Sequence, residues 1–446
     1  MTTLGDVRRT GLLVAVTCVG VALTLLLLVD HNNFDIRVYD GAINSWAGGG
    51  DLYAYGLGGR HLGFTYPPFA ALLMLPMTLL PQYAVIVVNA TAIALAIVLA
   101  VRVVVGNTFL ASRHGVWYST AFALPLACLL QPIRDTLGFG QVNLYLALLV
   151  LADLVALRRG LRWAGLGVGL ATAIKLTPGL FIVFYLLTSQ RRAVRNAIVA
   201  AATATALSAL VVPGTSWTFW TSALLDPSRV GFYDDAANQS MAGVIARLSD
   251  SHQLSTVPWL LAVAVVLPLG LARARKAWYR GDELAALTLV GLTAGLVAPI
   301  TWVHHLFWLV PALVILVDTG LRHRSWPPLA VAAGSVALFA SGVNVAIGQH
   351  VGNHMSRGIL IILGENAYAV CCLLLLLVVP TDRTTRTAPV DLTWRPPSRG
   401  RMPVEHPTRG TAREREQPAP RRGAREGAAA HGVVVRRRAR PGGRVG

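Results

Sequence analysis

The stretch D-H-N-N-F-D-I-R-V-Y-D-G-A, from Asp30 to Ala42, directly follows an apolar run that ends at Val29. Its three carboxylates, Asp30, Asp35 and Asp40, therefore lie at the end of a membrane-spanning segment. Charged groups at such a position are costly unless they face water or a partner, so the cluster predicts a functional site. The alternative is that these acids are only solvated residues that cap a short surface helix.

The spacing within this stretch predicts which carboxylate faces the protein. If the segment is helical, Asp35, Tyr39 and Ala42 share one face by the i, i+4, i+7 rule. Arg37 and Asp40 then point elsewhere. We therefore expect Asp35 to be the carboxylate held closest to the helical bundle.

The composition predicts an all-α polytopic membrane protein. The 446 residues are 54% hydrophobic and 13% charged, whereas soluble domains have roughly 25% charged residues. The net charge of +18 could suggest a nucleic-acid partner, but residues 381–446 hold sixteen Arg against six Asp or Glu. Over half of the excess thus lies in the tail, and the other basic clusters flank apolar runs, as the positive-inside rule expects of cytoplasmic loops. No nucleic-acid partner is expected.

The cysteines give no sign of a disulfide framework or a metal site. All four fall within apolar runs and lack metal-ligand spacing: Cys18, Cys128, Cys371 and Cys372. We therefore expect neither a metal nor another cofactor.

The apolar runs predict about twelve membrane spans with both termini in the cytoplasm. The run at residues 11–29 follows Arg8 and Arg9 without a cleavage site, so it is predicted to be an uncleaved first span. The proline-bounded segment 67–80 is expected to be interfacial or re-entrant. The other spans are expected near residues 83–105, 115–130, 142–157, 163–174, 178–189, 196–212, 257–272, 284–298, 305–320, 327–347 and 358–380.

Two of these spans are too short for a full crossing. Residues 163–174 and 178–189 provide about twelve residues each, against roughly 20 for a complete span. Both flank the sequence Lys175-Leu176-Thr177-Pro178. The tip of this hairpin is therefore expected to lie in a cavity below the outer surface, where a lysine must face water or an anion.

The composition changes abruptly after Pro380. Residues 381–446 are rich in Arg, Pro, Gly and Ala and poor in aromatic residues, so they cannot bury enough apolar surface to offset their chain entropy. We expect a membrane domain over residues 1–380 and a disordered basic cytoplasmic tail over 381–446.

Under this topology, the polar residues that are unusual in apolar surroundings collect on the outer face. Gln141 and Asn143 could instead be interhelical hydrogen-bond partners, and His304 and His305 could belong to an aromatic belt. Together the residues would enclose a cavity with one carboxylate and several cationic or amide groups. They are Asp35, Arg37, Gln131, Arg134, Asp135, Gln141, Asn143, Lys175, Asn238, Gln239, Ser240, His304 and His305.

Such a cavity suits attack on a sugar whose leaving group is a phosphate. A carboxylate can take the proton of an acceptor hydroxyl, while cations stabilise the charge on the departing phosphate. The outer loops hold no D-x-D pair, and no nucleotide-binding glycine motif is present. A lipid-linked sugar is therefore expected as the donor in place of a metal-bound sugar nucleotide.

Six ordered motifs carry a family resemblance. The chain resembles the actinobacterial polyprenol-phosphate-mannose-dependent α-(1→2)-mannosyltransferases of glycosyltransferase family 87, in the C-type glycosyltransferase superfamily. The resemblance covers roughly residues 11 to 380. The motifs are F-D-I-R-V-Y-D-G-A at 34–42, F-T-Y-P-P-F-A at 64–70, G-Q-V-N at 140–143, K-L-T-P at 175–178, N-Q-S-M-A-G at 238–243 and W-V-H-H-L-F-W-L-V-P at 302–311.

The resemblance implies a C-type glycosyltransferase fold and a site that faces outward from the cell membrane. Asp35 matches the catalytic aspartate expected to be the general base, and one of His304 and His305 matches the histidine thought to meet the donor phosphate. We expect Lys175 and Arg37 beside that phosphate. Substrate-binding residues are expected at Tyr39, Tyr66, Arg134, Gln141, Asn143, Asn238, Gln239 and Ser240.

The implied reaction is an inverting transfer, without a metal, from polyprenyl-phosphate-mannose to the 2-hydroxyl of a mannosylated glycolipid. Such reactions build phosphatidylinositol mannosides, lipomannan and lipoarabinomannan in the family. Two alternatives remain open on the sequence. One is a transporter or flippase for a lipid-linked sugar, although no repeated halves are visible. The other is the same reaction with a different polyprenyl-linked sugar, such as arabinofuranose.

Overall fold

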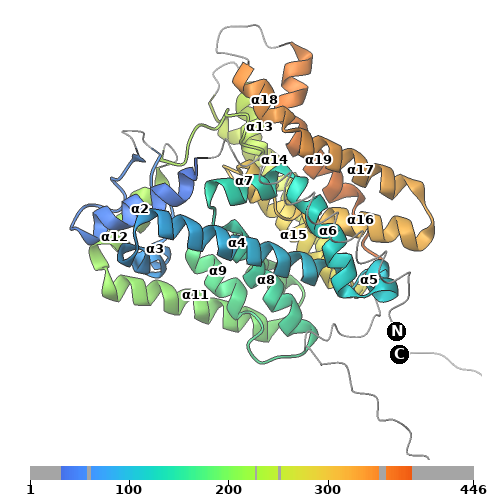
Figure 1. The fold of residues 1–446 in the computed structure, drawn as a ribbon, viewed down its shortest axis with the longest axis horizontal. Coiled ribbons are helices and arrows are strands. Elements are labelled where there is room, and N and C mark those ends of the chain that lie inside the picture. The colour runs from blue at the N-terminus through green and yellow to red at the C-terminus, as the bar shows by residue number, and fades with distance from the viewer. Residues whose placement is uncertain (1–31, 58–61, 227–228, 250–252, 351–357, 384–446) are drawn as a thin grey trace, which may run out of the picture. The chain divides into compact units, whose positions relative to one another are not determined.

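The computed structural model describes residues 32–57, 62–226, 229–249, 253–350 and 358–383, which form helices joined by loops (Figure 1). Within this part of the chain, an isolated bridge between Asn238 and Trp302 is the only β-type pairing. The expected all-α class is therefore confirmed. The predicted first span at residues 11–29 and the chain from residue 384 onward lie outside the described residues.

The helices follow one another along the chain with short connections. Up to residue 211 they are α2 (Phe34–Ala47), α3 (Pro68–Met74), η2 (Leu75–Leu79), α4 (Gln82–Val105), α5 (Phe109–His114), α6 (Val116–Leu129), α7 (Gln131–Phe139), α8 (Asn143–Arg158), α9 (Leu166–Ile174), α10 (Gly179–Leu187) and α11 (Arg191–Val211). After it they are α12 (Pro213–Thr221), η3 (Ala223–Leu225), α13 (Met241–Leu248), α14 (Thr256–Tyr279), α15 (Glu283–Val297), η5 (Val303–His305), α16 (Leu309–His323), α17 (Trp326–Ser341), α18 (Val343–His350) and α19 (Ile359–Val378).

The structure does not confirm twelve full spans. Among the described residues, four helices are long and apolar enough to cross a membrane, namely α4, α11, α14 and α19, and a fifth crossing is possible if α6 and α7 form one span. The other segments expected to cross form helices of 9 to 16 residues. As expected, α3 and η2 are together too short for a crossing.

The bend between α6 and α7 determines where the residues of α7 lie relative to the site. Hydropathy predicts a span at residues 115–130, and α6 ends there, at Leu129; α7 then turns away from α6 by 78°. Leu130 between them is extended, and Pro132 lies in the first turn of α7. Proline has a backbone conformation suited to the first turn of a helix and no N–H to donate, so Pro132 favours a new helix that starts at Gln131. The polar residues of α7 are thereby directed to the protein interior.

Two hydrophobic clusters form the core. One packs α2, α3 and the segment around Tyr53 and Tyr66. The other joins α4, α8, α10, α14, α15, α16 and α19. In Figure 1, α4 crosses the middle of the view and α11 runs along one side of it. The candidate site described below has walls from both clusters, so it lies between them.

A buried charge network fastens the end of the described chain. Arg383 contacts both carboxylate oxygens of Asp282, at 2.6 and 2.8 Å, and its Nη1 lies 3.0 Å from Oδ2 of Asp318. Both carboxylates are fully buried, and Asp318 also accepts a hydrogen bond from Arg322 Nε at 2.8 Å. Asp282 caps α15 by accepting a hydrogen bond from the backbone of Ala285. Arg383 therefore belongs to the helical domain, although it lies just past the boundary that we expected at residue 380.

We expect Arg383→Met to destabilise the protein by about 3–5 kcal/mol, because removing one partner leaves buried carboxylates uncompensated. Thermal unfolding in detergent measures this loss. Arg280→Met is the matched control, since Arg280 pairs with Asp382 at 3.3 Å while both side chains are exposed, and an exposed pair contributes about 0–1 kcal/mol. Equal effects of the two substitutions would contradict the prediction.

Candidate active site

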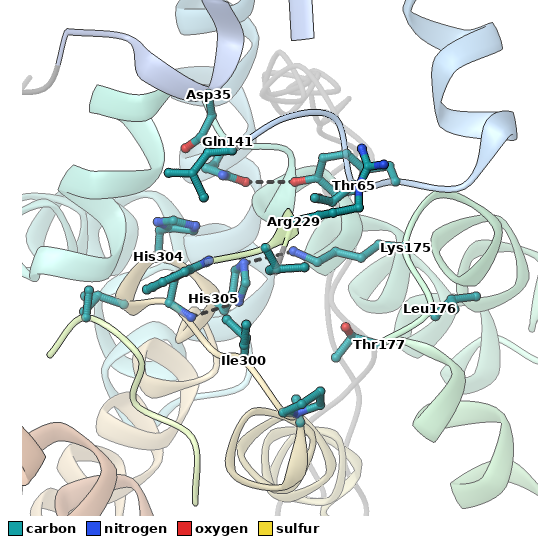
Figure 2. Close-up of a pocket in the computed structure, with 18 of the residues that line it drawn as sticks. Asp35, Thr65, Gln141, Lys175, Leu176, Thr177, Arg229, Ile300, His304 and His305 are labelled. Carbon is teal, nitrogen blue, oxygen red and sulfur yellow. Dashed lines mark hydrogen bonds between the residues drawn. The ribbon is translucent and has the colours of Figure 1, made fainter. Parts of the chain in front are cut away.

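A cavity of about 1430 Å³ lies between the two hydrophobic clusters. Its walls come from α2, the segment before α3, α7, the turn between α9 and α10, and the residues around η5. Pockets for one small ligand usually measure about 300–1,000 Å³, so this cavity has room for more than one substrate. Figure 2 shows Asp35 and Gln141 on one side of it, with His304, His305 and Lys175 facing them.

Asp35 lies in the first turn of α2 and points into the cavity. Tyr39, one turn later, lines the same wall, while Ile36 and Val38 are buried. Arg37 is exposed and does not line the cavity. The expected shared face of Asp35 and Tyr39 is thus observed, and the prediction that Arg37 binds the donor phosphate is corrected, because the helical period directs Arg37 away from the site. Asp40, which we expected to lie farther from the bundle than Asp35, is itself buried and accepts a hydrogen bond from Gln82 of α4 at 3.2 Å, outside the cavity.

Burial changes the acidity of Asp35. It raises the pKa of this carboxyl from 3.8 to about 6, while a hydrogen bond from Gln141 and the charge of Lys175 act in the opposite direction. A carboxylic acid that titrates near neutral pH can accept a proton from a hydroxyl and release it to water. Among the residues expected in the site, Asp35 therefore has the properties of a general base.

Gln141 owes its position to the glycine before it. Gly140 ends α7 with φ +75°, a backbone conformation that favours glycine. A Cβ atom at Gly140 would lie 2.7 Å from Cβ of Ile36, so only glycine lets this turn approach α2. Asn89 Nδ2 donates to the carbonyl of Gly140 at 3.0 Å. The turn thus places Gln141 beside Asp35.

Two tyrosines extend the polar wall. The hydroxyls of Tyr39 and Tyr66 are 2.8 Å apart, and Tyr66 Oη donates to Oε1 of Gln141 at 3.2 Å. Oε1 also accepts from Asn143 at 3.1 Å, which leaves the amide nitrogen of Gln141 to donate to Asp35. The structure therefore brings together Asp35, Tyr39, Tyr66 and Gln141, as expected.

Lys175 lies at the break between α9 and α10. Its backbone is extended, so α9 ends at Ile174 and the next helix starts only at Gly179. As expected, this turn lines the cavity. Nζ of Lys175 lies 2.9 Å from Oδ1 of Asn143 and 2.9 Å from Nε2 of His305, and 5.4 Å from the centre of the Tyr66 ring. Burial lowers the pKa of Lys175 to about 7, although the charge of Asp35 acts to raise it.

The two histidines come from η5 and face the cavity together. Nδ1 of His305 accepts a hydrogen bond from the backbone N–H of Trp302 at 3.2 Å. The ring centres of His304 and His305 are 4.7 Å apart. Burial lowers the pKa of His305 well below 6.5. His305 is thus a neutral imidazole. Both histidines lie across the cavity from Asp35.

Asn143 supports the site without lining the cavity. Its amide nitrogen donates to Gln141 Oε1 at 3.1 Å and lies 3.5 Å from the carbonyl oxygen of His304. Its amide oxygen is thereby turned toward Lys175. We predicted Asn143 to bind substrate; the structure places it outside the cavity lining, with its amide oxygen bonded to Lys175.

Arg134 lines a separate wall on α7. Its Nη2 donates to the carbonyl of Ala340 at 3.3 Å. Gln131 donates to Asp135 at 3.2 Å and accepts from Tyr368 at 2.7 Å. Arg134, Gln131 and Asp135 all line the cavity, so this group provides a second polar region beside the one at Asp35.

The structure corrects the prediction for Asn238, Gln239 and Ser240. All three are fully buried, and none lines the cavity. Asn238 and Gln239 bond to backbone groups, such as the N–H of Thr301 at 2.9 Å and the N–H of Ala369 at 2.8 Å. Ser240 caps α13. These bonds join the segment to the loop before η5 and to α19, so the structure places the three residues outside the cavity.

Arg229 lines the cavity but was not among the residues predicted from the sequence. Its Nη2 donates to the carbonyl of Phe64 at 3.2 Å, and its guanidinium carbon lies 5.4 Å from the centre of the Tyr53 ring. A signal was present, because Arg229 is the only Lys or Arg between Arg195 and Arg247. A lone cation in a loop expected on the outer face departs from the positive-inside rule.

The described residues contain no group of three or more His, Cys, Asp or Glu side chains that could hold a metal ion. The titratable groups that line the cavity include one carboxylate of raised pKa, one lysine, two histidines and two arginines. These can take a proton on one side and stabilise an anion on the other.

Comparison with known proteins gives a consistent result. The model of glycosyltransferase family 87 matches residues 64–299. A Mycolicibacterium smegmatis protein named polyprenol-phosphate-mannose-dependent alpha-(1-2)-phosphatidylinositol mannoside mannosyltransferase is 35% identical over 67% of this chain and 73% of its own length. The Mycobacterium tuberculosis (strain H37Rv) protein of the same name is 30% identical over 65% of this chain and 71% of its own. A pentamannoside mannosyltransferase from another M. tuberculosis strain is 32% identical over 71% and 74%. No solved structure matches the chain.

Proposed function

The chain belongs to glycosyltransferase family 87, and on that premise we propose that it transfers mannose from polyprenyl-phosphate-mannose to the 2-hydroxyl of a mannosylated phosphatidylinositol. The names of its relatives supply the donor and the acceptor class. The observation that carries the proposal is the cavity in which Asp35 faces Lys175 and His305.

In the proposed reaction, Asp35 takes the proton of the acceptor hydroxyl while that oxygen attacks C1 of the donor sugar. The bond from C1 to the phosphate oxygen breaks, and its electron pair goes to the leaving polyprenyl phosphate. Lys175 and His305 donate hydrogen bonds to that phosphate as its charge grows. A single displacement inverts C1, so a β-linked donor gives an α-linked product.

The proposal includes the arrangement in the membrane that the sequence predicts. We place the cavity on the outer face, with both termini in the cytoplasm, and assign the remaining crossings to pairs of the shorter helices. The broken helices around Lys175 support this assignment, because irregular backbone at membrane depth is tolerated where it lines a cavity.

Transfer by the purified full-length chain in lipid nanodiscs tests the function. Radiolabelled mannose should move from polyprenyl phosphate to phosphatidylinositol mannosides, and an α-(1→2)-mannosidase should release it. Movement of the donor across the bilayer without transfer would favour the flippase alternative. If a polyprenyl-linked arabinofuranose competes with the labelled donor and its sugar is transferred, the donor is arabinofuranose and not mannose.

The pH dependence follows from the raised pKa of Asp35. Because a base must be ionised, the rate should fall about tenfold per pH unit below pH 6, where Asp35 becomes protonated. The measurement is kcat/KM between pH 4.5 and 7 on protein shown to stay folded. An acidic limb centred near pH 4, the ordinary range of an aspartate, would contradict the assigned environment.

A further inference from the structure

The hydrogen bonds of His305 restrict where its proton lies. Nδ1 faces the backbone N–H of Trp302 at 3.2 Å, and a backbone N–H can only donate. Nδ1 is therefore the acceptor, and the single proton of the neutral ring is on Nε2. Turning the ring over would replace both nitrogens with carbons and lose this contact together with the one to Lys175.

The proton on Nε2 in turn determines the state of Lys175. Nε2 lies 2.9 Å from Nζ of Lys175, so its N–H donates and the lysine nitrogen must accept. An ammonium group has three donors and no acceptor, whereas an amine has a lone pair. The other contact of Nζ is satisfied either way, because Oδ1 of Asn143 accepts an N–H from an amine or from an ammonium.

We propose that Lys175 is an uncharged amine in this network and takes up one proton when a phosphate ester binds. An ammonium at Lys175 and the N–H of His305 cannot bond to each other, so both would turn to the anion. Phosphate binding thus converts a pair that bonds internally into two donors directed at one ligand. The inference rests on the proposed function for the identity of the anion.

The surroundings of Lys175 agree with an amine. In the described part of the chain its hydrogen-bond partners are Asn143 and His305, neither of which is a carboxylate. The charge of Asp35 acts to raise the pKa of Lys175. Burial acts in the opposite direction and is the larger effect, so the pKa of Lys175 falls to about 7. The facing titratable groups are Asp35 and Tyr39 from α2, Tyr66, and His304 and His305 from η5; Arg134, Asp135, Asp226, Arg229 and Tyr233 also line the cavity.

The expected linkage has a definite sign. Below pH 7 Lys175 already carries its proton, so it takes up none on binding. Above pH 7 the free protein has the amine and the complex has the ammonium, whose pKa the bound anion raises. Proton uptake should then approach about one per ligand, and affinity should fall about tenfold per pH unit.

Calorimetry on the full-length chain in detergent tests this. The probe is a farnesyl methyl phosphodiester, because a phosphate monoester has a second pKa of about 6 and would itself take up protons. Titrations at pH 6 and pH 8.5, each in two buffers of different ionisation heat, give the number of protons bound. We expect a value near one at pH 8.5, where Asp35 is ionised in both states and Lys175 supplies the change. At pH 6 Lys175 already carries its proton, so the uptake that remains there belongs to Asp35 and should be the same in the Lys175 variants.

Three variants assign the proton. Lys175→Arg keeps a permanent positive charge and Lys175→Met keeps none, so at pH 8.5 both should bind with no proton uptake, and above pH 7.5 their affinity should not depend on pH. The second variant covers the case in which arginine does not fit. Lys276→Arg is the matched control, since Lys276 is the other lysine of the chain and is exposed on α14, and it should retain the uptake.

The outcomes separate the inference from the proposed function. Wild-type protein that binds the probe without proton uptake at pH 8.5 would overturn the inference and leave the proposed function intact. Uptake that persists in both Lys175 variants would overturn the assignment to Lys175. A protein that binds no phosphodiester at either pH would remove both the proposed function and the inference.

Discussion

Asp35→Asn is expected to lower the turnover rate of mannosyl transfer by roughly 10²- to 10⁴-fold, the usual contribution of a general base. The amide keeps the size of the side chain and can still meet Gln141, but it cannot take the proton of the acceptor hydroxyl. Donor binding should survive, because the groups assigned to the phosphate are untouched. Single-turnover rates and donor affinity, measured on the same purified variant, separate the two effects.

Arg37→Gln is the matched control on the same helix. Arg37 is exposed and lies outside the cavity, so this variant should keep turnover within about twofold of wild type, as surface substitutions usually have small effects. Activity of Asp35→Asn within a few-fold of wild type would remove Asp35 from the role of base. A large loss of turnover in Arg37→Gln would show that Arg37 takes part in the site and would contradict the placement of α2.

The face of α2 could be predicted because helical geometry alone determines it. Asp35 and Tyr39 are four residues apart and lie over each other, whereas Arg37 lies on another side whatever the rest of the fold. Lys175 was also predictable, since two apolar segments of about twelve residues cannot each cross a bilayer. In both cases a short-range rule decides where the side chain points.

The roles of Asn238, Gln239 and Ser240 could not be predicted in this way. A buried polar residue looks the same in the sequence whether its partner is a ligand or a backbone carbonyl, and here the partners lie more than 50 residues away, as with Thr301 and Ala369. Polar groups inside a protein must find such partners. Only the three-dimensional arrangement shows which of them remain directed at the cavity.

The number of spans stays a prediction for a related reason. Hydropathy places the end of a span near residue 130, where α6 ends, but it contains no direction and cannot detect that the chain then turns by 78° into α7. Pro132 is visible in the sequence, but whether it kinks a span or starts a new helix in another direction depends on packing against η5 and α17. That turn is also what brings Arg134 to the cavity.

The second large effect is expected at the groups assigned to the leaving phosphate. Lys175→Met and His305→Ala should each lower turnover by roughly 10²- to 10³-fold, the usual cost of losing one donor to a developing anion. Donor affinity at pH 6.5 should fall less, because the donor phosphodiester gains its second charge only as the bond to C1 breaks. The two groups lie 2.9 Å apart and act on one phosphate, so the double variant should lose less than the product of the two single losses.

Single-turnover rates on folded, quantified variants measure these effects, with His323→Ala as the control because His323 is exposed in the last turn of α16. A purely structural role for Lys175 and His305 would lower the unfolding temperature or the yield and leave the turnover of the surviving protein unchanged. Unchanged rates in both single variants would therefore show that Lys175 and His305 do not stabilise the leaving phosphate. A loss in affinity equal to the loss in turnover would show that the pair holds the donor without stabilising the transition state.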